Sequence, residues 1–141
     1  MEEYSINSYS TEQKAIESYL SESITSYGMK QLNGFTPFKL YSSCVSNSGQ
    51  IIGAIMGTVT LNMLFVSHLF VEEKHRNKGI GKKLLLEIEV VALESNCNII
   101  RLNTFNKKTN SLYIKSGFNE TTSIPNYMSG FDLVYYEKAI S

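Results

Sequence analysis

Residues 69–85 read LFVEEKHRNKGIGKKLL, in which a short apolar run passes through a charged segment into a helical pattern. The apolar run is typical of a buried strand. From Gly79 to about Ser95, apolar side chains recur at the spacing of one helix face. The stretch therefore predicts a strand, a loop and a helix, with Gly79 and Gly81 where the helix starts. The apolar stripe of this helix comprises Ile80, Leu84, Leu85, Ile88, Val91 and Ala92.

The start of this helix has the properties of an anion site. The first backbone N–H groups of a helix have no partners within it, and the aligned peptide dipoles add roughly half a positive charge there. Gly79 and Gly81 have no Cβ, so a phosphate group can approach the backbone closely. Arg76, Lys78 and Lys82 add positive charge on both sides of these glycines. The loop and the helix start therefore predict a site for a pyrophosphate.

Two common phosphate-binding motifs do not fit this stretch. A P-loop has Ser or Thr directly after its Gly-Lys pair, whereas Lys83 follows Gly81-Lys82 here. A dinucleotide-binding fingerprint needs a third small residue at the position of Leu84. A nucleotide-phosphate binder of either kind is therefore disfavoured.

The rest of the chain predicts a single domain over residues 1–141. A capping box at Ser10–Gln13 precedes a helix that we expect to stop at Gly28. Met29–Pro37 is ambiguous between a short helix and a loop. The element order β-α-βββ-α-β-α-ββ predicts an α/β fold, a mixed sheet with helices on both faces. The other expected elements are strands at Glu3–Asn7, Phe38–Val45, Gln50–Thr60, a segment ending at Val71, Asn98–Thr104, Phe118–Thr122 and Phe131–Lys138, a helix at Lys107–Ser116, and a last loop with Pro125 and Gly130.

Composition narrows the class of partner. Thirteen Lys and Arg residues balance thirteen Asp and Glu residues, so no overall field attracts nucleic acid or an anionic membrane. Cys44 and Cys97 are too few and too far apart for a disulfide framework or a metal site. We therefore expect no nucleic acid, no metal and two reduced core cysteines.

One apolar stretch has the length of a membrane span. Ile51–Val71 carries no formal charge, but Gly53, Gly57 and Asn62 interrupt it and β-branched residues are frequent. Two consecutive buried strands explain it better than a membrane helix. The acidic first residues also lack the order of a signal peptide. We therefore expect no membrane contact and a cytoplasmic protein.

The motif Arg76-x-x-Gly79-x-Gly81 after a Leu69-x-Val71 strand resembles the acetyl-CoA-binding motif of the GNAT-type N-acetyltransferases. The element order of the whole chain agrees with this family. The resemblance implies a mostly antiparallel central sheet that is splayed at the cofactor site, and acetyl-CoA as acyl donor. It implies backbone hydrogen bonds from the strand to the pantetheine arm and thioester, and a pyrophosphate cradle after it. The strand residues are Leu69, Phe70 and Val71; the cradle residues are Arg76, Asn77, Lys78, Gly79, Ile80, Gly81 and Lys82.

A second part of the resemblance lies near the last helix. Asn106 and Tyr113 match the family pattern Asn-x-x-(small)-x-x-x-Tyr, with Thr109 in place of the usual Ala. The resemblance implies that Asn106 bonds the cofactor arm and that Tyr113 is the general acid at the cofactor sulfur. The ending from Tyr113 to Gly117-Phe118 also fits the family.

No base residue is evident from the resemblance. Some relatives carry Glu or His at the positions of Phe65 and Ser67, and neither of these accepts a proton well. Strand alternation places His68 on the face opposite Ser67, so we expect a structural His68, with a water chain or a neutral amine serving instead. We expect His75 to be solvated.

Other candidate residues are weaker. Asp132, Tyr135 and Tyr136 border the acceptor pocket or a dimer contact in relatives, although packing explains them equally well. Lys107-Lys108 is expected at a solvated helix start, near the adenine or 3′-phosphate side of the cofactor at most.

The sequence thus favours an enzyme that moves an acetyl group from acetyl-CoA to a primary amine of a small molecule, peptide or protein. The amine attacks directly in a ternary complex. The alternative is a catalytically quiet acyl-CoA-binding or regulatory module, which the missing base leaves open. We expect a monomer or a homodimer.

Overall fold

The computed structural model describes residues 2–105 and 107–141, apart from the side chain of Lys107. The chain divides into two compact units, one up to Thr36 and one from Pro37 to Ser141. No helix in the described residues is long and apolar enough to cross a membrane.

The first unit contains one helix, α1, Lys14–Gln31. It passes through Gly28 because a glycine inside a helix costs only about 1 kcal/mol. It ends instead where Asn33 and Gly34 adopt positive φ, and the Gly34 N–H donates to the Met29 carbonyl at 2.7 Å. The helix expected to stop at Gly28 therefore continues to Gln31, and no second helix lies between it and Pro37.

The expected first strand was wrong. Residues 3–7 form no strand in the structure. Within residues 2–36, α1 is the only helix or strand, so this unit has no second strand to pair the N–H and C=O groups of residues 3–7. The capping-box prediction was also wrong, since Gln13 occupies the N-cap of α1 and makes no side-chain capping bond.

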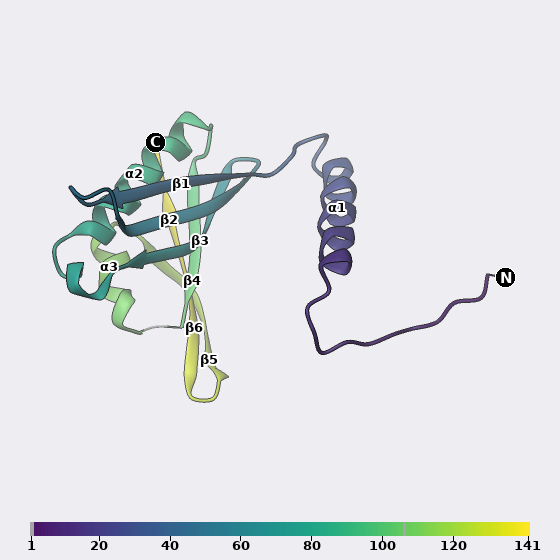
Figure 1. Cartoon of the computed structure of the whole chain (residues 1–141). Coiled ribbons are helices and arrows are strands. Elements are labelled where there is room, and N and C mark those ends of the chain that lie inside the picture. Colours follow the sequence, from purple (N-terminus) through teal and green to yellow (C-terminus); the bar gives the residue numbers. More distant parts are fainter. Residues whose placement is uncertain (1, 106) are drawn as a thin grey trace. The chain divides into compact units, whose positions relative to one another are not determined.

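The second unit is built on a six-stranded sheet (Figure 1) in the order β1-β2-β3-β4-β6-β5. Only the β3–β4 pair is parallel, so the sheet is mostly antiparallel as expected. The strands are β1 Phe38–Val45, β2 Ile51–Thr60, β3 Met63–Val71, β4 Ile99–Thr104, β5 Asn119–Met128 and β6 Phe131–Ala139. The helices are α2 Ile80–Glu94 and α3 Asn110–Lys115, with short 3-10 turns η1 Glu73–His75 and η2 Lys107–Thr109.

The last hairpin is longer than the sequence indicates. Strand β5 continues through Pro125 to Met128, and the turn is confined to Ser129 and Gly130, which both have positive φ. Pro125 is tolerated because β5 lies at the edge of the sheet, and the pairing with β6 is interrupted between Ile124 and Met128.

Helices α2 and α3 lie on the same face of the sheet (Figure 1). A Cβ atom built on Gly53 of β2 would contact the side chains of Ile80 and Leu84. Helix α2 therefore packs on the face of the sheet to which position 53 points. Residues paired across neighbouring strands point to the same face, and the pairs from β2 through β3 and β4 place Tyr136 of β6 on the face covered by α2. The Tyr136 ring contacts the Tyr113 ring of α3, with 5.5 Å between the ring centroids, so α3 lies on this face too. Within residues 37–141, we therefore find both helices on one face rather than on two. The fully buried side chains include Ile55, Val59, Leu64, Ile88, Ile100, Leu102 and Tyr136.

The sheet opens between its two middle strands. Strands β3 and β4 pair only from Met63↔Ile99 to Phe65↔Arg101. Beyond that point β3 continues to Val71 and β4 to Thr104 without pairing with each other. The edge of β3 facing β4 is therefore open from Val66 onward, which is the splay that the family resemblance implies.

A β-bulge lies at the start of this opening. Met56 pairs with His68 and Gly57 pairs with Val66, so Ser67 is the extra residue on β3. A Cβ on Gly57 would lie 2.7 Å from the Phe65 carbonyl oxygen and 2.7 Å from a Leu64 methyl carbon. Glycine at this position thus permits the close approach of the two strands beside the bulge.

We predict that Gly57→Ala lowers the free energy of unfolding by about 1–3 kcal/mol, because the methyl group forces backbone to move in a packed sheet. Urea denaturation followed by circular dichroism measures this. Gly28→Ala is the matched control: a Cβ there has open space in α1, so stability should stay equal or rise by up to about 1 kcal/mol. Equal stability of the wild type and Gly57→Ala would contradict the close approach.

Candidate functional site

A cavity of about 520 Å³ lies where β3 ends, α2 begins and α3 approaches. Its β3 residues lie beyond Phe65, where β3 no longer pairs with β4. Three segments line it: Leu69, Phe70 and Val71 of β3; His75, Arg76, Asn77, Gly79, Ile80, Gly81 and Lys82 of the loop and first turn of α2; and Lys108, Thr109, Leu112 and Tyr113 around α3.

The loop before α2 presents backbone amides to this cavity. Asn77 has a φ of 60° and Gly79, the N-cap of α2, has a φ of 82°. Left-handed residues that alternate with right-handed ones turn successive N–H groups inward, toward an anion. The N-cap makes no side-chain capping bond, and the first turn carries no acidic residue. No side-chain cap or acidic residue of this turn therefore takes up the first amides of α2.

Arg76 is held against the end of β3. Its Nε donates to the Val71 carbonyl at 2.8 Å, and its guanidinium lies 5.3 Å from the centroid of the Phe70 ring. One edge of the guanidinium is thus fixed to the strand, and the terminal N–H groups remain for an anion in the cavity. This contact positions the charge, and among the described residues no carboxylate forms an ion pair with Arg76.

Tyr113 lies at the inner end of the cavity. Its side chain is buried, packing edge-on against Phe118 at 6.0 Å and beside Tyr136 at 5.5 Å between ring centroids. Burial raises the pKa of the Tyr113 hydroxyl, and the neighbouring Tyr136 raises it further. The hydroxyl therefore stays protonated at neutral pH and is able to donate a proton or a hydrogen bond.

Tyr136, which packs against the ring of Tyr113, is buried. This agrees with the expectation that Tyr136 is a packing residue. Its hydroxyl donates to the Asn110 side-chain carbonyl, which joins β6 to the first turn of α3. Burial raises the pKa of Tyr136, and Glu120 adds to the effect. Glu120 and Asp132 line a second, smaller hollow of about 220 Å³ beside it.

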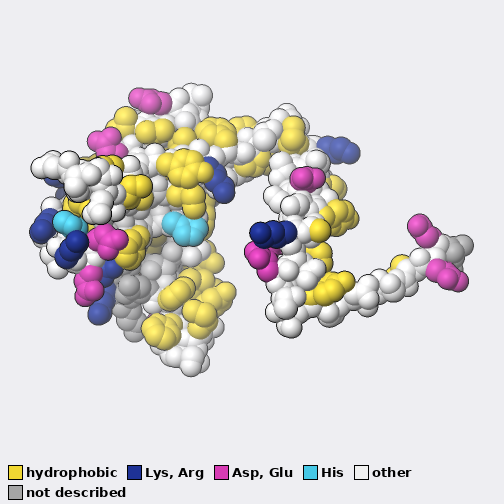
Figure 2. Space-filling model, in the orientation of Figure 1, with side chains coloured by type: hydrophobic (Ala, Val, Ile, Leu, Met, Phe, Trp, Pro, Cys, Tyr) yellow, Lys and Arg dark blue, Asp and Glu magenta, His cyan; other side chains and the backbone are white. Residues whose placement is uncertain are grey.

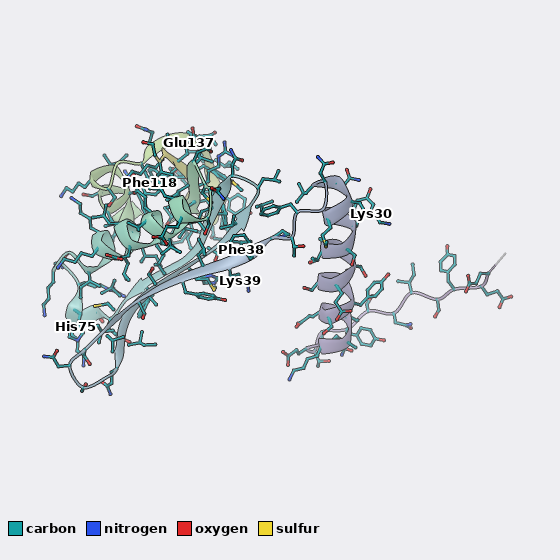
Figure 3. All side chains as sticks on the ribbon, turned by 90° about the horizontal axis from the view of Figure 1, so that it is seen from above. Lys30, Phe38, Lys39, His75, Phe118 and Glu137 are labelled. Carbon is teal, nitrogen blue, oxygen red and sulfur yellow. The ribbon has the colours of Figure 1, made fainter. Side chains whose placement is uncertain are left out.

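The cavity brings together the predicted cofactor residues from Leu69 through Lys82, together with Tyr113, except for Lys78, which is exposed and does not line it. Asn106, also predicted as a cofactor residue, lies outside the described residues. His75, expected to be solvated, is half-buried and lines the cavity on the loop between β3 and α2 (Figure 3). Sequence reasoning missed Leu112, whose only signal was its spacing one residue before Tyr113.

His68 lies on a different face from the one that strand alternation predicts. Phe65 pairs with Thr58 and His68 pairs with Met56. Thr58 and Met56 point to the same side of β2, so the bulge places His68 on the face of Phe65, away from α2. Its Nδ1 lies 2.9 Å from Ser67 Oγ. Both His side chains are visible at the surface in Figure 2.

A mixed sheet that opens beside a helix start with unpaired amides is typical of transferases that use an acyl-coenzyme A. Residues 40–120 match the family model of the acetyltransferase (GNAT) domain. The chain therefore belongs to the GNAT acetyltransferase family, whose acyl donor is acetyl-CoA, and the resemblance found in the sequence is confirmed.

One curated protein is similar to this chain in sequence, and two solved structures are similar to it in fold. The acetyltransferase Atu2258 of Agrobacterium fabrum is 25% identical over 122 residues, which cover 86% of this chain and 89% of that protein. A solved structure from Agrobacterium tumefaciens, described as an acetyltransferase, has a TM-score of 0.88 at 22% identity and covers 97% of this chain and 100% of its own. A Bacillus anthracis protein described as a streptothricin acetyltransferase, solved in complex with acetyl coenzyme A, has a TM-score of 0.67 at 24% identity over 73% of this chain and 63% of its own.

We predict that Gly81→Glu removes measurable binding of coenzyme A, because its carboxylate enters the cavity at the amide turn and repels the pyrophosphate. A Cβ on Gly81 would make only an ordinary 3.4 Å contact with a Leu112 methyl carbon, so the variant should fold. Isothermal titration with coenzyme A measures the affinity. Gly81→Ala controls for the loss of glycine alone and should weaken binding far less. A folded Gly81→Glu protein with wild-type affinity would remove the site from this turn.

Proposed function

We propose that the protein transfers the acetyl group of acetyl-CoA to a primary amine of a small molecule, a peptide or a protein, by direct attack in a ternary complex. The observation that carries this proposal is the continuity of three features in one cavity. These are the open edge of β3, the amide turn at the start of α2 and the protonated hydroxyl of Tyr113.

The residues present fit coenzyme A. The amide turn at Asn77–Gly79, with Arg76 and Lys82 beside it, suits the pyrophosphate, since it offers main-chain donors and positive charge without a neighbouring carboxylate in the first turn of α2. The backbone of Leu69–Val71 is assigned to the pantetheine arm. Lys78, which does not line the cavity, is assigned only a long-range electrostatic contribution.

Two groups of the chain then act on the reacting atoms. Acetyl-CoA supplies a thioester, which an amine attacks to give an amide and a thiol. The backbone N–H of Phe70 or Val71 is assigned to the oxygen that becomes negative, where one well-placed donor is worth about 3–4 kcal/mol. Tyr113 donates its proton to the leaving sulfur, and burial keeps that proton in place at neutral pH.

Support for a cytoplasmic enzyme comes from the two cysteines. Cys44 and Cys97 are both free in the structure, and Cys97 is buried. Free cysteines are usual in a reducing compartment. We assign the protein to the cytoplasm on this ground. We also propose that it is a monomer or a homodimer.

A second candidate is a catalytically quiet acyl-CoA-binding module. Phe65 and Ser67 occupy the positions where some relatives place a base, which favours this alternative. Incubation of the protein with acetyl-CoA and a panel of primary amines, with detection of free thiol, separates the two. Thiol release that depends on the amine supports the enzyme, whereas a higher melting temperature with coenzyme A and no thiol release supports the binding module.

We predict that Tyr113→Phe lowers kcat by about 100-fold or more and changes the dissociation constant of coenzyme A by less than threefold, because the hydroxyl acts on the leaving sulfur. Steady-state kinetics and titration measure the two. Phe118→Leu disturbs the same aromatic cluster without removing a hydroxyl; it should lower the melting temperature and reduce kcat far less. Equal kcat for Tyr113→Phe and the wild type would leave Tyr113 a packing residue.

The raised pKa of Tyr113 also predicts a pH dependence. The acid must be protonated, so its contribution to kcat should be lost only as pH rises above the ordinary tyrosine value of about 10. The free energy of unfolding depends on pH in the same direction. The contribution of neutral Tyr113 is complete below the pKa of this tyrosine in the unfolded chain, and it is lost as pH rises through its raised pKa in the folded protein. Denaturation at pH 8 and at pH 11 should show this loss, and Tyr113→Phe should reduce it.

A further inference from the structure

The bulge in β3 creates an arrangement around His68 that a regular strand does not give. On a regular strand, Phe65 and His68 point to opposite faces. The extra residue Ser67 brings both side chains to the face that α2 and α3 leave open within residues 37–141. His68 is exposed and directly precedes Leu69, the first cavity-lining residue of β3. His68 is therefore on the part of β3 that no longer pairs with β4, next to Leu69–Val71, the segment assigned to the pantetheine arm.

Hydrogen bonds around the bulge select one tautomer of His68. The Ser67 hydroxyl donates to the Met56 carbonyl at 3.3 Å. With its single proton placed in this bond, the Ser67 oxygen accepts from Nδ1–H in the 2.9 Å contact with His68, and we infer this tautomer. A neutral imidazole with its proton on Nδ1 carries its lone pair on Nε2. Nε2 is therefore the basic atom, and Nδ1 is the atom fixed to the bulge.

The groups that share this face leave the lone pair of Nε2 available. Across the sheet, Met56 separates His68 from Tyr41 of β1. The charged residues on this face are Lys39 of β1, Arg101 of β4 and Glu137 of β6. Arg101 and Glu137 pair with each other at 3.2 Å. No ion pair of a carboxylate with His68 occurs among the described residues, so no acidic side chain occupies Nε2.

We propose that His68 is the general base of the acetyl transfer, with Ser67 as its positioning residue; this inference rests on the proposed function. The amine nitrogen forms its bond to the carbonyl carbon with its own lone pair, and the carbonyl electrons move to oxygen. The proton lost by nitrogen goes to Nε2 of His68. The electron pair on oxygen then re-forms the C=O bond as the carbon–sulfur bond breaks. The sulfur leaves with the electrons of the broken bond and takes the proton of Tyr113, and solvent carries a proton from His68 back to Tyr113.

The variant His68→Asn tests this role with little change in structure. The Asn side-chain amide N–H replaces Nδ1–H as donor to Ser67, so the bulge keeps its bond, but no basic atom remains. We expect kcat to fall by about 100-fold or more while the dissociation constant of coenzyme A stays within twofold. A fall of less than tenfold overturns the proposal.

The pH profile distinguishes a base from a structural residue. The acceptor should be a weakly basic amine that is neutral throughout the measured range, so that its own ionisation does not appear. The wild type should lose kcat/KM toward acid pH, as the imidazole takes up a proton, and His68→Asn should show no such acid limb. An acid limb that persists in the variant overturns the proposal.

Ser67→Ala tests the positioning role. It should lower kcat several-fold in the wild type and have no further effect in the His68→Asn background, because the two residues act as one unit. Equal effects of Ser67→Ala in both backgrounds would show that the hydroxyl does not act through His68.

A measurement without turnover separates this inference from the proposed function. Long-range 1H–15N correlation of the imidazole should report the proton of neutral His68 on Nδ1. A proton on Nε2 overturns the base assignment whether or not the protein is active. Conversely, coenzyme A binding without thiol release from any amine in the wild type would contradict the proposed function, and with it the catalytic role of His68, even if the tautomer is as expected.

Discussion

The parting of β3 from β4 is the constraint on which the site depends. Two parallel strands that stayed paired to their ends would satisfy each other's N–H and C=O groups and leave none for a ligand. Here the pairing ends at Phe65 and Arg101, while β2 remains bonded to β3 through to Val71. The β3 segment is therefore held rigidly on one side and open on the other. A backbone that is fixed but unpaired is a preorganised set of donors and acceptors.

The proposed cofactor site is locally positive in a protein without net charge. Thirteen positive and thirteen negative residues cancel overall, yet the cavity lining contains Arg76, Lys82 and Lys108 and no Asp or Glu. Attraction is thus a local property, produced by a few side chains and by main-chain dipoles at the start of α2. Such short-range interactions are less sensitive to salt than a field spread over the whole surface.

Much of this could be predicted from the sequence, and the exceptions have physical causes. The strand–loop–helix stretch combines a strong helical period with glycines at its start, so the amide turn and most of its lining residues follow from it. The bulge did not follow, because alternation assumes one residue per step and Gly57 was its only trace in the sequence. The end of α1 was missed because Gly28 was taken as the stop signal, whereas the chain turns at Asn33-Gly34. The length of β5 was missed because Pro125 was taken to end the strand, although proline is acceptable on an edge strand.

Pro125 also bears on how copies of this chain can associate. An exposed edge strand offers a row of N–H and C=O groups to which another chain can add. On β5 that row lacks the N–H of Pro125, and the ladder beneath it is broken between Ile124 and Met128. The outer side of β5 is thus a poor template for continuing the sheet. Growth of the sheet from copy to copy through this edge is disfavoured, which restricts edge-to-edge polymerisation to the opposite strand, β1.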